Sequence, residues 1–156
     1  MSSSLKVQFD DPQGGWMVVT IRSDASVVTL SVSSVLYDTL DELVDSLHAL
    51  ATGDDHPSVR IFEEPTSCEL QFKRENGTIG LKLCRFASFS RPRSGKPGET
   101  LLATAGTFAE MCLPFWRALR SLQTRFSDQE FQLRWRRPFP TSGMEKLSAN
   151  LSSIPR

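Results

Sequence analysis

The chain is poor in the side chains that catalysis and metal binding use most: its 156 residues include two histidines, three cysteines and one tyrosine. Cys68, Cys84 and Cys112 are odd in number and scattered, with no Cys-x-x-Cys pair among them. This pattern argues against a disulfide framework and lacks the ligand spacing of a zinc site. We therefore expect three buried, reduced thiols, no bound metal and no cofactor.

Short catalytic motifs are missing as well. The sequence has no Gly-x-Ser-x-Gly turn, no Walker phosphate loop, no Gly-x-Gly-x-x-Gly and no His-Glu-x-x-His. A small enzyme with a dispersed acid/base site remains an alternative, with His56 acting beside Glu63 and Glu64. Consecutive strand residues point to opposite faces, however, so the two glutamates do not easily join one site.

Long apolar runs are absent too. No stretch approaches the roughly 20 residues that a bilayer-spanning helix needs, and residues 1–6 lack the apolar segment of a signal peptide. We therefore expect a soluble, cytoplasmic protein with no membrane partner. Because 39% of the residues are hydrophobic, the chain is expected to fold, and its length fits a single domain over residues 1–156.

The net charge of zero hides a strong asymmetry between the two halves of the sequence. Residues 1–78 carry 13 acidic and five basic side chains, and residues 79–156 carry 13 basic and five acidic ones, giving −8 and +8. Such separation marks a face for a charged partner, unless the two halves interleave in space and neutralise each other. The sequence leaves both interpretations open.

Two hairpins are predicted. Residues 16–33 alternate apolar and polar side chains around a turn at Asp24-Ala25, which favours an antiparallel pair with one buried face. A second pair, 67–74 and 78–86, flanks Asn76-Gly77, a sequence suited to a type I′ turn. The expected cross-strand pairs are Ile21 with Val28, Val19 with Leu30, Met17 with Val32, Leu70 with Leu83, and Phe72 with Leu81.

A helix is predicted between the hairpins, over about residues 39–52. Thr39 and Glu42 have the spacing of a capping box, and Gly53 follows as a stop signal. Leucine and valine side chains then recur every three or four positions, which predicts one buried face. The apolar positions are Leu40, Leu43, Val44, Leu47 and Leu50.

The last third, residues 107–156, is predicted to be helical. Thr107 and Glu110 form a second capping box, and Pro114 predicts either a kink or a helix that begins near Leu113. Residues 87–99, rich in serine, proline, glycine and positive charge, are expected to form a mobile loop. Strands are also expected at 59–61 and 100–105.

The predicted fold class is α+β. It comprises a sheet-rich part over residues 1–106, with an antiparallel sheet of five to six strands and one helix inserted between hairpins. The helical third is expected to pack on one face of that sheet.

A basic cluster, Arg134-Trp135-Arg136-Arg137, raises a nucleic-acid alternative for the C-terminal third. Guanidinium groups next to an aromatic ring neutralise phosphates and stack on bases. Nucleic-acid-binding domains are usually strongly basic, however, and this chain has a net charge of zero and a pI near 6.7. Nucleic acid is therefore not the expected partner.

The layout resembles that of small bacterial α+β proteins, including uncharacterised families and the immunity proteins that neutralise a cognate toxin. The resemblance rests on Trp16 at the start of a hairpin, the Leu40–Leu50 helix, Phe62-Glu63-Glu64-Pro65, and Arg134-Trp135 before Pro138-Phe139-Pro140. It implies a non-catalytic inhibitor with a protein partner, such as a basic toxin domain. A fold-level analogy of this kind suggests a function and assigns no residues.

The missing catalytic motifs and the separated charge favour the same hypothesis. Acidic residues of the first half are expected to steer and hold a basic partner, because complementary charges raise association rates and select partners. Self-association to a homodimer through an open strand edge is a further alternative. The candidate partner-binding residues are Asp41, Asp45, Asp54, Asp55, Glu63 and Glu64.

Overall fold

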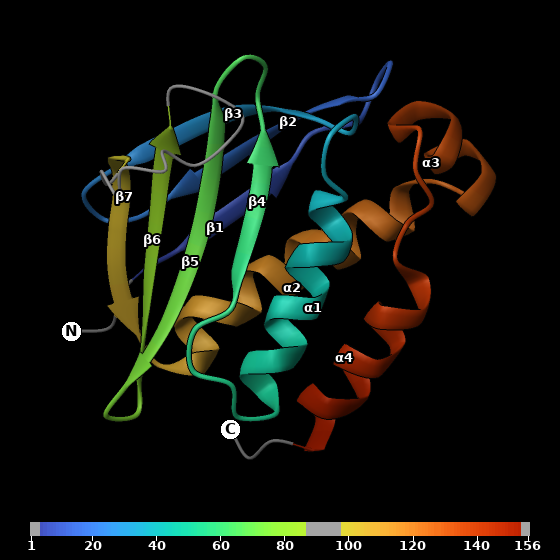
Figure 1. Ribbon diagram of the computed structural model, residues 1–156. Coiled ribbons are helices and arrows are strands. Elements are labelled where there is room, and N and C mark those ends of the chain that lie inside the picture. Colours follow the sequence, from blue (N-terminus) through green and yellow to red (C-terminus); the bar gives the residue numbers. More distant parts are fainter. Residues whose placement is uncertain (1–3, 87–97, 154–156) are drawn as a thin grey trace.

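The computed structural model describes residues 4–86 and 98–153, which form a seven-stranded antiparallel sheet with helices on one side (Figure 1). Each strand pairs with its neighbours in sequence order. The strands are β1 (Lys6–Phe9), β2 (Trp16–Arg22), β3 (Val27–Ser33), β4 (Ser58–Phe62), β5 (Ser67–Glu75), β6 (Thr78–Phe86) and β7 (Glu99–Gly106). The helices are α1 (Thr39–Ala51), α2 (Phe108–Arg125), α3 (Asp128–Trp135) and α4 (Thr141–Ser153).

The α+β class is confirmed, but the sheet has more strands than the five to six predicted. The additional strand is β1, whose four residues are too few for their alternation to stand out in the sequence. Of the loop expected over 87–99, residues 87–97 lie outside the described residues. Gly98 precedes β7, and Glu99, which was expected in the loop, is the first residue of that strand.

Both predicted hairpin registers are confirmed. In β2 and β3, Val19 lies opposite Leu30, and in β5 and β6, Leu70 lies opposite Leu83. Asn76-Gly77 forms the second turn with φ of 52° and 78°, the left-handed values that a type I′ turn requires. The residues of the turns and the two-residue period of the strands therefore determine the register of both hairpins.

The predicted cap of α1 is wrong by one residue. Asp38 is the N-cap, and its side chain accepts a hydrogen bond from the backbone N–H of Asp41 at 3.3 Å. Thr39 lies inside the helix and donates its hydroxyl to the carbonyl of Arg60 at 2.9 Å. Glu42 binds Arg60 as well, at 2.8 Å. Both side chains of the predicted capping box therefore bind Arg60 of β4 instead of capping the helix.

The start of α2 is confirmed as predicted. Glu110 N donates to the Thr107 hydroxyl at 3.1 Å, and Thr107 N donates to the Glu110 carboxylate at 2.9 Å. The helix begins at Phe108 and continues through Pro114 to Arg125, rather than beginning near Leu113. Pro114 lies within the helix, where its missing N–H removes one intrahelical hydrogen bond.

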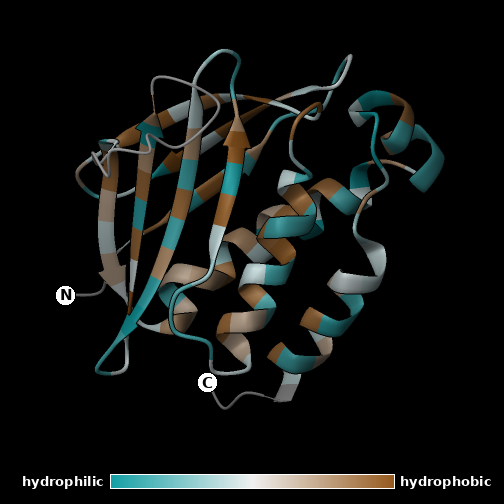
Figure 2. Cartoon of the chain, viewed as in Figure 1, coloured by the Kyte–Doolittle hydropathy of each residue, from teal (hydrophilic) through white to brown (hydrophobic). Residues whose placement is uncertain are grey.

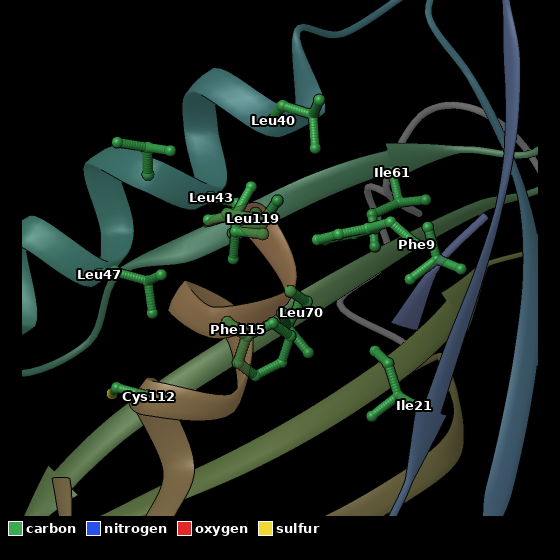
Figure 3. Packing of buried hydrophobic residues seen from close by; sticks show 14 of the residues in the cluster. Phe9, Ile21, Leu40, Leu43, Leu47, Ile61, Leu70, Cys112, Phe115 and Leu119 are labelled. Atoms are coloured by element: carbon green, nitrogen blue, oxygen red, sulfur yellow. The ribbon is translucent and has the colours of Figure 1, made fainter. Parts of the chain in front are cut away.

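The hydrophobic core lies between the sheet and the helices α1 and α2. Figure 3 shows Leu43 of α1, Phe115 of α2 and Leu70 of β5 gathered in this core, and each is at most 4% exposed. Helix α4 packs on α1 as an outer layer, so closely that a Cβ on Gly143 would lie 2.9 Å from Cγ1 of Val44. The helical third is thus divided, with α2 against the sheet, α3 against β2 and α4 on α1.

The two faces of the sheet differ, as alternation predicts. Figure 2 shows hydrophobic and hydrophilic bands alternating along the strands. The outer face of β3 is exposed at Thr29 and Ser31, but on β5 and β6 the outward-facing Glu69 and Cys84 are buried. The outer face is therefore polar and open over β3 and covered over part of β5 and β6.

The sheet narrows at its centre. Between β3 and β4, the register contains one residue pair, Ser33 with Phe62, whereas β2 and β3 pair along seven residues. In Figure 1 the strands β1 to β3 cross behind the other four. None of the helices in the described ranges combines the length and apolarity that crossing a bilayer requires.

Candidate functional site

Two of the predicted acidic residues lie together on α1. Asp41 and Asp45 are exposed, and with the N-cap Asp38 they have spacings of three and four residues, which place them on one side of the helix. We call Asp38, Asp41 and Asp45 the acidic helix face. The structure therefore brings like charges together where the helix begins.

The electrostatics of the acidic helix face reflect this crowding. Partial burial, and next the negative charge of Asp41, raise the pKa of Asp45. Partial burial is also the main cause that raises the pKa of Asp38, opposed by the hydrogen bond from the Asp41 N–H. Repulsion among these carboxylates thus destabilises their charged forms, and a cationic partner would relieve it.

Asp54 and Asp55 lie elsewhere, beyond the C-terminal end of α1. The 13 residues of α1 span about 20 Å at 1.5 Å per residue, so these two carboxylates are remote from Asp41. Both are exposed. Arg74 bonds to their backbone, donating its N–H to the Asp55 carbonyl at 2.7 Å and Nε to the Asp54 carbonyl at 3.4 Å.

The two neighbouring glutamates have different environments. Glu63 has an 11% exposed side chain and accepts hydrogen bonds from Arg85 Nε at 3.1 Å and from the Cys68 thiol at 3.2 Å. Glu64 is exposed. The carboxylate of Glu63 is therefore engaged inside the chain, and only Glu64 presents its charge to solvent.

A pair of isosteric substitutions distinguishes these two roles. Glu63→Gln is expected to lower the free energy of unfolding by about 1–2 kcal/mol, because it leaves the partly buried Arg85 without its charged acceptor. Glu64→Gln is expected to change it by less than about 0.5 kcal/mol. Urea denaturation followed by circular dichroism measures both, and equal effects would contradict the structural role of Glu63.

Four large apolar side chains are exposed on segments that hydrogen bonds join near the start of α1. Val35 is 74% exposed, Leu36 41%, Trp16 40% and Leu133 74%. We call these four residues the apolar corner. Only Tyr37 separates Leu36 from Asp38 in the chain, so the exposed apolar residues lie next to the start of the acidic helix face.

Hydrogen bonds hold the segments of the apolar corner together. Gly15, next to Trp16, donates its N–H to the carbonyl of Arg134 at 2.9 Å, and Ser34 donates its N–H to the carbonyl of Gly15 at 2.9 Å. Arg137 donates to the carbonyl of Val35 at 3.2 Å. The start of β2, the segment after β3 and the end of α3 therefore form one fixed surface.

The basic cluster at the end of α3 contributes hydrogen bonds to the apolar corner and exposes no aromatic ring for stacking. Trp135 is completely buried and is not available to bases. Arg134 pairs with Glu130 at 3.3 Å, and its guanidinium lies 4.9 Å from the centre of the Phe126 ring. Of the three arginines in the cluster, Arg136 is the exposed one.

The dispersed acid/base site is not assembled in the structure. His56 precedes β4 and Glu63 follows it, so the five residues of β4 separate them by about 16 Å. Burial and the hydrogen bond to Glu63 raise the pKa of the Cys68 thiol to about 12, so it is protonated at neutral pH. Within residues 4–86 and 98–153, no group of three His, Cys, Asp or Glu side chains is placed to hold a metal ion.

The two charged halves of the sequence meet in space at several points. Ion pairs join the acidic first half to the basic second half at Arg85–Glu63 (3.1 Å), Arg125–Asp11 (2.7 Å) and Arg137–Asp38 (3.9 Å). Part of the separated charge is therefore neutralised inside the fold. The acidic helix face retains Asp41 and Asp45 as exposed carboxylates.

The apolar corner is the part of this site that sequence patterns did not identify. The available signal is two apolar residues, Val35 and Leu36, between a serine pair and a helix cap, which is not distinctive by itself. Comparisons of the chain with protein-family models, curated proteins and solved structures find no match.

Proposed function

We propose that this protein is a non-catalytic binding module that recognises and neutralises a basic protein, in the manner of the toxin-neutralising proteins that its layout resembles. The acidic helix face and the apolar corner form the binding surface. The observation that carries the proposal is their proximity, since exposed Val35 and Leu36 are separated only by Tyr37 from Asp38, the N-cap of α1. Known interfaces combine an apolar centre with a charged rim in this way.

The apolar corner supplies the part of the surface that gains from losing water. Burying Val35 and Leu36 against a partner removes apolar area from solvent, at about 25 cal/mol per Å². Trp16 adds a side chain of the type that is enriched among residues dominating binding energy. Because hydrogen bonds fix the three segments, little conformational entropy is lost on binding.

The acidic helix face supplies selectivity and speed. Asp41 and Asp45 repel each other in the free protein, and this repulsion is relieved when lysine or arginine side chains approach. Complementary charge also increases the rate of diffusional encounter, most strongly at low salt. The surface therefore favours a partner whose contacting face is basic.

Affinity capture followed by toxicity rescue tests the proposal. The tagged protein is used to recover binders from the source organism, and the recovered protein is then produced alone. We expect a basic protein that arrests growth when expressed and is neutralised by co-expression of the wild-type chain. The Asp41→Asn/Asp45→Asn variant is expected to bind about tenfold or more weakly at low salt and to rescue growth less well.

A charge-matched control separates a local effect from a general one. Asp24→Asn/Glu145→Gln removes the same charge from exposed positions on other elements and is expected to bind as the wild type does. Leu36→Ala is expected to speed dissociation of the complex, because it reduces the buried apolar area. An acidic partner, or undiminished binding by the Asp41→Asn/Asp45→Asn variant, would contradict the proposed surface.

A further inference from the structure

A groove separates β1 from α2, on a surface distinct from the acidic helix face. It has a volume of about 550 Å³, and a smaller hollow of about 230 Å³ continues along the same elements. The walls of the groove are apolar on both sides. One side has Leu5, just before β1, and Val7 of β1, and the other has Pro114 and Ala118 of α2. The groove therefore runs beside the free edge of the sheet.

Backbone groups of β1 face this groove. Asp10 donates its N–H to the Val18 carbonyl at 2.9 Å, which marks these residues as a hydrogen-bonded pair between β1 and β2. Because such pairs alternate, Val7 and Phe9 turn their backbone groups to the free edge. The Arg125 guanidinium donates a hydrogen bond to the Phe9 carbonyl at 2.6 Å, which agrees with that carbonyl facing away from β2. By the same alternation, the N–H and C=O of Val7 point away from β2 and towards the free edge.

Three cations line the same groove. Lys6, Arg22 and Arg117 are exposed, and none has an ion-pair or hydrogen-bond partner within the described ranges. Arg125, by contrast, pairs with Asp11 at 2.7 Å. Lys6 and Arg22 are also direct cross-strand partners, a placement that costs stability between like charges. No carboxylate is among the described residues that line the main cavity.

We propose that this groove binds an extended acidic segment of a protein partner, which adds to the sheet as a strand beside β1. The Val7 backbone would pair with the added strand, as in other cases of strand addition. Carboxylates of the segment would neutralise Lys6 and Arg22 on the outer face of the sheet, and Arg117 at the margin of the groove. This surface is independent of the proposed binding of a basic partner.

The alternation of a strand specifies the form of the segment. Side chains on its outer face meet Lys6 and Arg22, whereas those on its inner face meet Val7, Pro114 and Ala118. An alternation of acidic and small apolar residues fits both faces. A second copy of this chain fits poorly, because pairing through the same edge brings the same cations together.

A synthetic peptide tests strand addition directly. The probe is a fluorescein-labelled, amidated heptapeptide in which glutamate alternates with valine, titrated with the full chain by fluorescence anisotropy at low and high salt. We expect saturable binding that weakens as salt is added. A peptide with proline at its central valine loses a backbone N–H without losing charge, and is expected to bind at least about tenfold more weakly.

Variants of the protein test the cations. Arg22→Gln and Arg117→Gln are each expected to weaken binding about threefold to tenfold, whereas Arg120→Gln, on α2 but outside the groove lining, leaves it unchanged. Val7→Pro removes the free-edge N–H, and the proline peptide makes the same test without altering the protein.

Three outcomes would overturn the proposal. Equal binding of the valine and proline peptides would indicate charge attraction without strand pairing. Failure of the heptapeptide to bind at millimolar concentration would exclude the acidic segment. Dimerisation in sedimentation experiments that Val7→Pro abolishes would identify a second copy of this chain as the occupant.

Discussion

Phe115→Ala is expected to lower the free energy of unfolding by about 3–5 kcal/mol, the usual cost of truncating a buried aromatic residue. Phe115 is 1% exposed on α2, between the sheet and the helices. Its ring meets that of Phe72 edge to face, with centres 5.8 Å apart. The substitution therefore removes both buried apolar area and an aromatic pair. Urea denaturation monitored by circular dichroism measures the loss.

A matched control addresses the effect of losing an apolar side chain in general. Leu133 is 74% exposed on α3, and Leu133→Ala is expected to change the free energy of unfolding by less than about 0.5 kcal/mol. Phe115→Leu, which retains most of the volume, is expected to cost less than the alanine variant. A loss below about 1 kcal/mol for Phe115→Ala would contradict the packing of α2 on the sheet.

Alkaline pH is expected to destabilise the fold through two buried thiols. Burial raises the pKa of Cys112 from 9.0 to about 12, and burial with the Glu63 contact raises that of Cys68 to about 12. The folded state therefore holds these protons above pH 9, whereas the unfolded chain releases them. Stability is complete below pH 9 and is lost as the pH rises towards 12.

The expected size is about 1.4 kcal/mol per thiol between pH 8 and pH 10. Urea denaturation at several pH values in this range, under reducing conditions, measures it. Cys112→Ala starts from a lower stability, but its dependence on pH is expected to be about half that of the wild type. An unchanged slope in this variant would show that Cys112 does not contribute.

The hairpins could be predicted from sequence because their determinants are local. The type I′ turn at Asn76-Gly77 aligns β5 with β6, and the buried face then follows from a period of two. The strand β1 could not be predicted with comparable support. It has four residues, and its place in the sheet comes from pairing with β2 after an intervening loop.

The α1 cap shows how tertiary contacts override a local motif. Asp38 and Thr39 are both good capping residues, and the sequence does not distinguish them. The structure does, because the Thr39 hydroxyl and the Glu42 carboxylate are taken by Arg60 of β4. A residue 18 or more positions away in the sequence thus decides which side chain caps the helix.

The candidate site was predictable only in part, for the same reason. Helical spacing groups Asp41 with Asp45 whatever the rest of the fold does. Whether the Glu63 carboxylate is exposed depends on Arg85, 22 residues away. The apolar corner depends on the contact of Arg137, which follows α3, with the segment after β3. Local patterns identify which residues are charged, whereas long-range packing decides which charges remain exposed.

The narrow junction between β3 and β4 divides the sheet into two ladders, β1–β3 and β4–β7, which a single residue pair connects. With one residue pair joining β1–β3 to β4–β7, sliding of one ladder past the other breaks little backbone hydrogen bonding. We expect resistance to such shear to come chiefly from the core, in which α2 packs on β1 of one group of strands and on β6 and β7 of the other. The mechanical stiffness of this protein is therefore a property of its core more than of its sheet.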